Sequence, residues 1–320
     1  MTHRDLPPGR LIDVGGFNLH VDCSGEGRPT VIFDAALGGS SVGWSLVQPK
    51  VAEFARACAY DRAGLGWSEA GPMPRTAGRM ADELRALLDR ADIEPPYVMV
   101  GHSFGTIVAR LFAARHRKEV VGLVLVDPAF PEDWFTPNAD ERRRMRRGVR
   151  LCRYGAGAAR LGLAGLVTKL AGGGPEGLAT AAARFVSRRS FAREPTELLS
   201  PIDKLPVDAR ARLTWMWTQP RFFRALGSQI DSICTSAQEL MSAGELLGDL
   251  PLAVVSATKP HPHHVMMQER LVAASSRGRR IVAVESGHWV PLEDPPTVVA
   301  AVRDVVETAK SETPPQSAPR

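Results

Sequence analysis

Short apolar runs rich in Val, Ile and Leu recur along the chain, and each run ends at polar or glycine-rich residues. Residues 11–22 hold two such segments on either side of Gly15-Gly16, a pattern that predicts a β-hairpin. Further runs, each of which predicts one strand, begin near residues 30, 57, 97, 120, 251 and 279. Continuous β-branched runs are typical of parallel strands that are buried on both faces.

Between these runs the apolar spacing becomes helical. Met80, Leu84 and Leu88 share one face, and the valines between 298 and 306 share another. Strands that alternate with amphipathic helices predict a mostly parallel sheet covered on both faces. In such sheets the ligand site lies beyond the carboxyl ends of the strands, so we look for chemistry there.

The alternation stops after the sixth predicted strand. Residues 131–250 contain no convincing strand and are rich in helical patterns, arginine and tryptophan, so we interpret them as a helical insertion. The core then comprises residues 1–130 and 251–310. The polar, proline-rich residues 311–320 are typical of a disordered tail.

The stretch Gly101-His102-Ser103-Phe104-Gly105 lies where an apolar run meets a helical pattern. It fits the form G-x-S-x-G, in which the chain turns from strand to helix at one strained residue and exposes a hydroxyl above the sheet. Side chains at the two flanking glycines would collide with neighbouring backbone. We therefore predict that Ser103 is a nucleophile.

The chain resembles the α/β-hydrolase superfamily, in its branch of capped esterases and hydrolases with a serine nucleophile. The motifs that carry the resemblance are VIFDAALGGSSVGW, YDRAGLGWS, VGHSFG, LVLVDPAF and SGHWVPLEDP, in the family's order between residues 10 and 310. The resemblance implies a mostly parallel eight-stranded sheet flanked by helices, with a helical cap inserted after the sixth strand. Family members that open epoxides or remove halogens use a carboxylate nucleophile, so the serine implies a different reaction.

In this superfamily the catalytic residues follow the order nucleophile, acid, histidine. His288 follows the last apolar run, at the family's histidine position. The usual acid position lies in residues 258–264, which contain no carboxylate, so we prefer Asp127 at the end of VVGLVLVD. Its alternative role is to open a turn as Asp-Pro. Other candidates for the acid are Asp61, then Glu269 and Glu285.

An oxyanion hole needs two backbone amides. The elbow supplies that of Phe104, and the family's second donor comes from the loop after the strand TVIFD. By position Ala36 is the first choice for that donor and Leu37 the second.

The insertion combines aromatic and basic residues. We expect several of its aromatic residues to line an apolar site, which favours a small hydrophobic ester-like substrate: Trp134, Trp215, Trp217 and Phe222. Arginines between Glu141 and Arg153 form a basic helix followed by the apolar stretch Leu161–Leu170. We interpret the basic face as solvated, although the stripe also fits weak peripheral contact with an anionic membrane.

The composition of the chain bears on its partners and its location. The net charge of +5 is mild and partly local, which argues against a nucleic-acid partner. No run is long and apolar enough to span a membrane, and the N-terminus does not have the form of a secretory signal. The four cysteines match no zinc spacing, so we interpret them as free thiols in a reducing, cytoplasmic setting.

We expect no metal and no cofactor. His261, His263 and His264 lie close together in sequence, but side chains on a proline-interrupted loop rarely converge on one ion. The main hypothesis is a serine hydrolase acting on a carboxylic ester. Alternatives are an amide, lactone or carbon–carbon bond hydrolase with the same triad, or a ligand-binding protein with little turnover; the oligomeric state is left open.

Overall fold

The computed structural model describes residues 7–163, 200–244, 247–258, 260 and 262–312. Its strands form one sheet in the order β1-β2-β4-β3-β5-β6-β7-β8. The pairs β1–β2 and β2–β4 are antiparallel, and all the other pairs are parallel. The predicted mostly parallel, eight-stranded sheet is therefore confirmed. The strands are β1 Arg10–Asp13, β2 Asn18–Ser24, β3 Thr30–Asp34, β4 Ala57–Tyr60, β5 Tyr97–His102, β6 Val120–Val126, β7 Leu252–Ala257 and β8 Gly278–Ala283.

Helices follow most of the parallel strands, and a group of helices lies between β6 and β7 in the chain. No helix in the described ranges has the length and apolarity needed to cross a bilayer. The helices are η1 Ser41–Trp44, α1 Gln48–Val51, α2 Ala77–Arg90, α3 Gly105–Arg115, α4 Glu132–Phe135, α5 Ala139–Arg160, η2 Ser200–Lys204, α8 Val207–Met216, α9 Pro220–Asp231, α10 Ile233–Ala243, α11 Pro262–Ala273, α12 Val290–Glu293 and α13 Pro295–Glu312.

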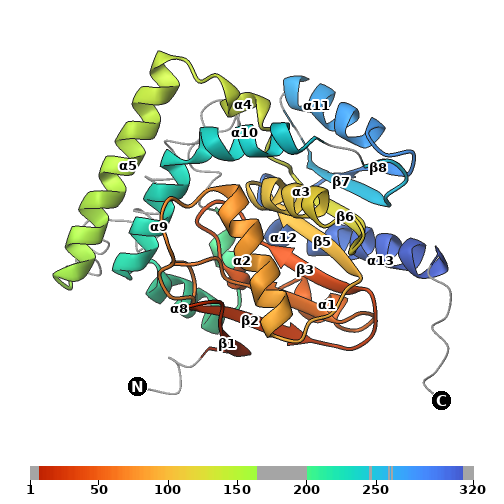
Figure 1. The fold of residues 1–320 in the computed structure, drawn as a ribbon, viewed down its shortest axis with the longest axis horizontal. Coiled ribbons are helices and arrows are strands. Elements are labelled where there is room, and N and C mark those ends of the chain that lie inside the picture. The colour runs from red at the N-terminus through yellow and green to blue at the C-terminus, as the bar shows by residue number, and fades with distance from the viewer. Residues whose placement is uncertain (1–6, 164–199, 245–246, 259, 261, 313–320) are drawn as a thin grey trace.

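Both faces of the sheet are buried at its central strands, which explains why these strands lack polar alternation. On β5, Tyr97 and Met99 pack in the apolar cluster with α2, α3 and α11, whereas Val98 and Val100 pack in the cluster with α1 and α13. Figure 1 shows α2 and α3 on one side of the sheet and α13 beyond it. This sandwich leaves only the strand ends open to a ligand.

The turn between β1 and β2 has the predicted hairpin form. Gly15 and Gly16 have φ values of +113° and +101°, a backbone region that favours glycine. Both amides donate to the Oδ1 atom of Asp13, at 2.8 Å each.

Part of the helical insertion packs in a layer of its own. Helix α5 lies at the outer edge of the molecule alongside α9 (Figure 1), and Cys152 and Ala156 of α5 share an apolar cluster with Phe222 and Phe223 of α9. Asn138 caps α5 and forms a reciprocal capping box with Glu141. Most of the apolar stretch Leu161–Leu170 lies outside the described residues.

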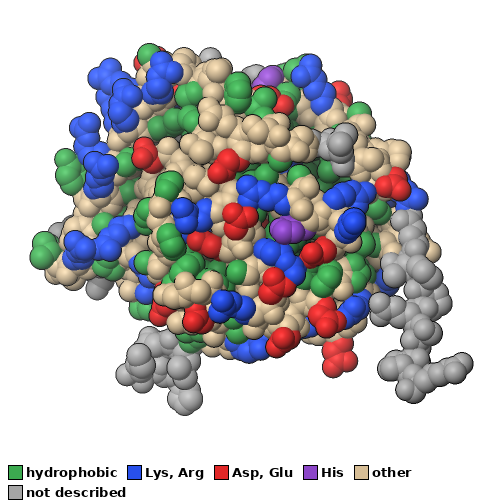
Figure 2. Space-filling model, viewed as in Figure 1, with side chains coloured by type: hydrophobic (Ala, Val, Ile, Leu, Met, Phe, Trp, Pro, Cys, Tyr) green, Lys and Arg blue, Asp and Glu red, His purple; other side chains and the backbone are tan. Residues whose placement is uncertain are grey.

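The outer face of α5 is basic, as expected from the sequence. Lys and Arg side chains gather over this helix at the upper left of Figure 2. Among the arginines of the helix, the side chains of Arg143, Arg146, Arg147 and Arg150 are exposed. Within the described part of the chain these four arginines have no carboxylate partner. The arrangement agrees with a solvated face, and peripheral membrane contact stays a prediction.

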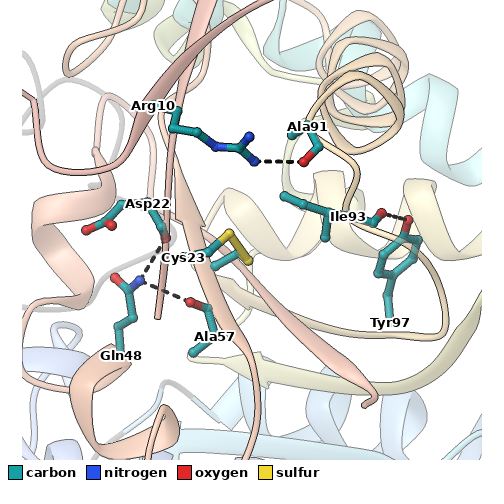
Figure 3. Close-up of a disulfide and its surroundings, with 9 residues drawn as sticks. Arg10, Asp22, Cys23, Gln48, Ala57, Ala91, Ile93 and Tyr97 are labelled. Carbon is teal, nitrogen blue, oxygen red and sulfur yellow. Dashed lines mark hydrogen bonds between the residues drawn. A yellow bond between two sulfur atoms is a disulfide. The ribbon is translucent and has the colours of Figure 1, made fainter. Parts of the chain in front are cut away.

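Two predictions about the chain need correction. Cys23 and Cys58 form a disulfide with a Cα–Cα distance of 4.1 Å, whereas Cys152 and Cys234 are free thiols. The pairing arises because antiparallel β2 and β4 place these two cysteines directly opposite each other (Figure 3). The cysteines therefore no longer support a reducing, cytoplasmic setting, and that location stays a prediction.

The predicted tail also begins too early. Helix α13 continues to Glu312, so the first two residues of the segment 311–320 are helical. The remaining residues, 313–320, lie outside the described residues.

Candidate functional site

Ser103 occupies the sharp turn between β5 and α3. Its φ of +53° lies in the left-handed region, which is strained for a residue with a side chain. The turn is held by several hydrogen bonds: the amide of Ser103 donates to the carbonyl of Val126 at 3.0 Å, and the hydroxyl and amide of Thr106 donate to the carbonyl of Ser103 at 2.6 Å and 3.0 Å. The backbone at Ser103 is thus fixed from both β6 and α3.

The glycines that flank the turn are required by close contacts. A Cβ atom on Gly101 would lie 2.6 Å from the carbonyl oxygen of Gly105, and one on Gly105 would lie 2.4 Å from that of Asp34. These separations are far below van der Waals contact, so the reason predicted from the motif applies here. They also show that the start of α3 lies against the end of β3.

His288 and Asp127 come together at the carboxyl ends of the strands. Nδ1 of His288 lies 2.7 Å from Oδ2 of Asp127, and the amide of Ala257 donates to the other carboxylate oxygen at 3.2 Å. Burial alone would raise the pKa of Asp127, but the hydrogen bond and the charge of His288 outweigh it, so this pKa lies below its ordinary value. Asp127 itself has a φ of +39° at the end of β6.

His102 braces the loop that carries His288. Its Nε2 donates to the backbone carbonyl of His288 at 2.8 Å, and the centroids of the two rings are 4.9 Å apart. Burial, followed by the neighbouring His288, lowers the pKa of His102 to about 3, so this imidazole stays neutral. These contacts give His102 a structural role beside the elbow. Since His102 directly precedes Ser103, they also place the ring of His288 beside the elbow.

The loop after β3 lies next to the elbow. Residues Ala35 to Gly39 include a turn in which the amide of Gly39 donates to the carbonyl of Ala36 at 2.9 Å. Neither the amide of Ala36 nor that of Phe104 donates a hydrogen bond to the part of the chain that the structure describes. Both amides are therefore available to an oxygen from a ligand.

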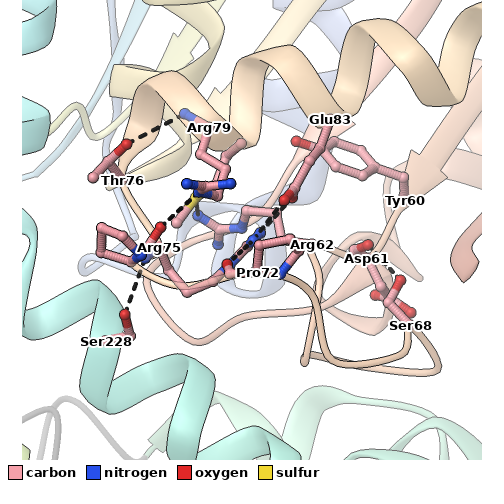
Figure 4. Close-up of polar contacts among 12 residues, drawn as sticks. Tyr60, Asp61, Arg62, Ser68, Pro72, Arg75, Thr76, Arg79, Glu83 and Ser228 are labelled. Carbon is pink, nitrogen blue, oxygen red and sulfur yellow. Dashed lines mark hydrogen bonds and ion pairs between the residues drawn. The ribbon is translucent and has the colours of Figure 1, made fainter. Parts of the chain in front are cut away.

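Arg62 contacts both the loop after β3 and the elbow. Its guanidinium donates to the carbonyl oxygens of Ala35, at 2.8 Å, and Ala36, and it lies 5.4 Å from the ring centroid of Phe104. Figure 4 shows Arg62 between Tyr60 and Arg75, near Glu83. The motif YDRAGLGWS was recognised through the family resemblance. The contact of its Arg62 with the loop after β3 was not predicted, because nothing in the local sequence indicates it.

The family model described as the alpha/beta hydrolase fold matches residues 29–295 of this chain. The chain belongs to the α/β-hydrolase family. This match spans both parts of the core as well as the helical insertion, so the assignment covers the whole site described above.

Individual relatives of this α/β hydrolase match only in part. The uncharacterized protein YqjL of Bacillus subtilis is 37% identical over 105 residues, which cover 33% of this chain and 42% of YqjL. An AB hydrolase superfamily protein of Gibberella zeae is 38% identical over 31% of this chain and 32% of its own length. The chain thus spans less than half the length of these relatives.

A solved structure shares the fold over almost its full length. A thermophilic esterase from Thermogutta terrifontis is 19% identical with a TM-score of 0.64, and the match covers 92% of this chain and 94% of the esterase. At this identity the likeness shows the fold alone. That fold agrees with the family match.

The other candidates for the acid of this α/β hydrolase are either bonded to other residues or exposed. Asp61 pairs with Nδ1 of the buried His20 at 2.8 Å and accepts the amides of Ser41 and Trp67 at 2.7 Å and 3.0 Å. Asp61 therefore organises the loops after β3 and β4 (Figure 4). Glu269 and Glu285 are exposed.

The four predicted pocket aromatics do not gather in one place. Trp134 packs against the core of the sheet, Trp215 packs near Leu292, and Trp217 and Phe222 belong to the cluster between α5 and α9. Their contact with substrate stays a prediction. Their shared position in the insertion could not reveal that they divide among three apolar clusters.

The histidines after β7 face a carboxylate. His263 and His264 lie 3.7 Å and 3.2 Å from the carboxylate of Asp133, and His261 lies outside the described residues. Within the ranges that the structure describes, no three His, Cys, Asp or Glu side chains are placed to hold a metal ion.

Proposed function

We propose that this chain is a serine hydrolase that cleaves a carboxylic ester of a hydrophobic small molecule through an acyl-enzyme on Ser103. The observation that carries the proposal is the 2.7 Å hydrogen bond between His288 and Asp127, on loops that meet at the strained turn of Ser103. A serine hydroxyl is a weak nucleophile that needs an adjacent base, and the base needs a partner that orients it.

Asp127 accepts the Nδ1 proton of His288, which leaves the lone pair of Nε2 for the hydroxyl of Ser103. As the Oγ atom bonds to the ester carbon, Nε2 takes the hydroxyl proton and the carbonyl oxygen becomes negative. His288 then returns that proton to the leaving alcohol. Water repeats the sequence on the acyl-enzyme, and no cofactor is consumed.

The negative oxygen is stabilised by the amides of Phe104 and Ala36, with Leu37 as the second choice for the latter. Support comes from the close approach of Gly105 to Asp34, which brings the two amide-bearing segments together. One such donor contributes roughly a hundred- to a thousandfold in rate.

The helices of residues 131–250 act as the cap over this site. Their seating on the loops at the strand ends supports this: Ala225 of α9 packs where a Cβ on Gly64 would lie, and the side chain of Arg221 donates to the carbonyl of Gly66 at 3.0 Å. A cap with aromatic side chains favours an apolar acyl or alcohol group.

The test is covalent labelling combined with turnover of a chromogenic short-chain ester. Ser103→Ala removes the attacking oxygen, so we expect no labelling by a fluorophosphonate probe and a rate at least about a thousandfold below wild type. Ser256→Ala is the matched control, because Ser256 is another buried serine, whose hydroxyl donates to the carbonyl of Ile281 on the adjacent strand at 3.3 Å.

A folded Ser103→Ala protein that retained wild-type turnover would refute the proposal. A wild-type protein with little turnover but a saturable thermal shift would instead indicate a ligand-binding protein. Profiling against esters, amides, lactones and carbon–carbon substrates ranks the reactions that the same three side chains serve.

A further inference from the structure

Helix α9 of the insertion contacts the loop after β3 through one buried side chain. Gln229 is fully buried, and its Oε1 accepts the amide proton of Gly38 at 3.1 Å. Gly38 has a φ of +66°, and a Cβ on it would lie 3.0 Å from Leu226 of the same helix. Among the described residues, this hydrogen bond is the one polar contact between α9 and the loop that carries Ala36.

The other end of this side chain has no partner in the described part of the chain. Since the backbone N–H of Gly38 can only donate, the carbonyl end of Gln229 must face it, and the orientation of the amide is fixed. Its Nε2 is buried and donates to no acceptor in the part of the chain that the structure describes. A buried, unsatisfied donor destabilises a fold, so the contact with the loop is kept at a cost in stability.

The position of Gln229 is rigid because its neighbours anchor α9. The hydroxyl of Ser228 accepts the amide of Arg75 at 3.0 Å (Figure 4), and Ile230 is fully buried in the apolar cluster between α5 and α9. A fixed acceptor on a fixed helix restrains the amide that it binds. The insertion can thereby hold a loop that belongs to the core.

We infer that Gln229 is a positioning residue that holds the loop of the second oxyanion donor through Gly38. This inference rests on the proposed function, because the loop matters only if Ala36 or Leu37 binds a developing negative charge. Gln229 does not touch the reacting atoms. It links the helical insertion to the loop of the proposed oxyanion donor. A change in the insertion therefore alters the reaction rate while the triad residues keep their positions.

The experiment is Gln229→Met, which keeps the volume but removes both polar ends. The loop then loses its acceptor, so we expect kcat on a chromogenic ester to fall about three- to tenfold, the range that corresponds to one neutral hydrogen bond. We expect KM to change less than about twofold, because the loop acts in the transition state. The melting temperature should change little, since the variant removes the unsatisfied Nε2 donor but leaves the amide of Gly38 without its acceptor.

Two variants serve as comparisons. Gln229→Glu still presents an oxygen to Gly38, so it should recover most of the lost kcat. Gln268→Met is the matched control: Gln268 is also buried, and its Oε1 accepts the Nε proton of Arg280 at 3.0 Å, on α11 and β8. This control should lower the melting temperature and leave kcat unchanged.

Hydrogen exchange of the peptide that contains residues 35–39 gives a readout independent of turnover. Gln229→Met should speed exchange at Gly38, whereas Gln268→Met should not. Unchanged exchange, or unchanged kcat in a wild-type enzyme that does hydrolyse esters, overturns the inference. Absence of wild-type turnover on every ester, with faster exchange in Gln229→Met, overturns the proposed function and leaves the structural link to the loop in place.

Discussion

Replacement of Asp127 by Asn changes one oxygen to an NH2 group at the centre of the proposed triad. In the wild type one carboxylate oxygen binds Nδ1 of His288 at 2.7 Å and the other accepts the amide of Ala257 at 3.2 Å. Asn must keep its oxygen toward Ala257, because that backbone N–H can only donate. The new NH2 group therefore faces His288 and donates to its Nδ1.

The consequence is the wrong imidazole tautomer. With Nδ1 as an acceptor, the proton of neutral His288 moves to Nε2, where the lone pair for Ser103 is needed. Loss of one charged hydrogen bond alone corresponds to about 1.5–3 kcal/mol, or roughly 10- to 150-fold in rate. Loss of the correct tautomer in Ser-His-Asp enzymes costs about ten-thousandfold, or about 5.5 kcal/mol. We expect Asp127→Asn to fall in the larger range.

The assay is kcat/KM on a chromogenic ester, with the folded fraction measured by circular dichroism. Asp61→Asn is the control, because Asp61 pairs with His20 and holds the amides of Ser41 and Trp67. Asp61→Asn should lower the melting temperature while the folded protein keeps its rate. If Asp127→Asn stays within tenfold of wild type, or if Asp61→Asn alone abolishes turnover in folded protein, the assignment of the acid is wrong.

Two further predictions concern stability. His102 has a pKa of about 3, below the ordinary value of 6.5. Between these two pH values, this side chain is protonated in the unfolded chain and neutral in the folded protein. The contribution is present above about pH 6.5 and is lost as the pH falls toward 3, by about 1.4 kcal/mol per pH unit; urea titrations of the wild type should show this slope, and an equal slope in His102→Gln would contradict it. The Cys23–Cys58 disulfide closes a loop of sequence separation 35, so the double serine variant should lose about 2–4 kcal/mol of unfolding free energy. Four reactive thiols in unreduced, denatured wild type would exclude the bond.

Features with a local cause could be predicted from the sequence. Apolar runs became strands because both faces of the sheet are buried, and Gly15-Gly16 became a turn because its φ values require glycine. The elbow at Ser103 was predictable for the same reason, since Gly101 and Gly105 have no room for a Cβ atom. In each case the residue types along a short segment indicate the conformation, although distant residues such as Asp34 beside Gly105 help to impose it.

Candidate site residues that must meet across a long stretch of sequence were harder to predict. The absence of a carboxylate in the loop after β7 pointed to Asp127 at the end of β6, and the fold brings it to His288 although 161 positions separate the two. Parallel strands end at the same edge, which made this meeting predictable in outline. The distance required the structure, and the role of Asp127 as the acid stays a prediction.

The sequence alone determined the elements, their order and the residues that carry reactive groups, because hydrophobic spacing and glycine sterics act over a few residues. Only the tertiary structure decided which distant residues meet. The disulfide depends on the register of β2 and β4. The contacts of Arg62 with Ala35 and of Gln229 with Gly38 depend on how loops and α9 pack over the strand ends. Such contacts leave no periodic signal, since each joins a side chain to a backbone group of a distant segment and depends on the packing of the whole fold.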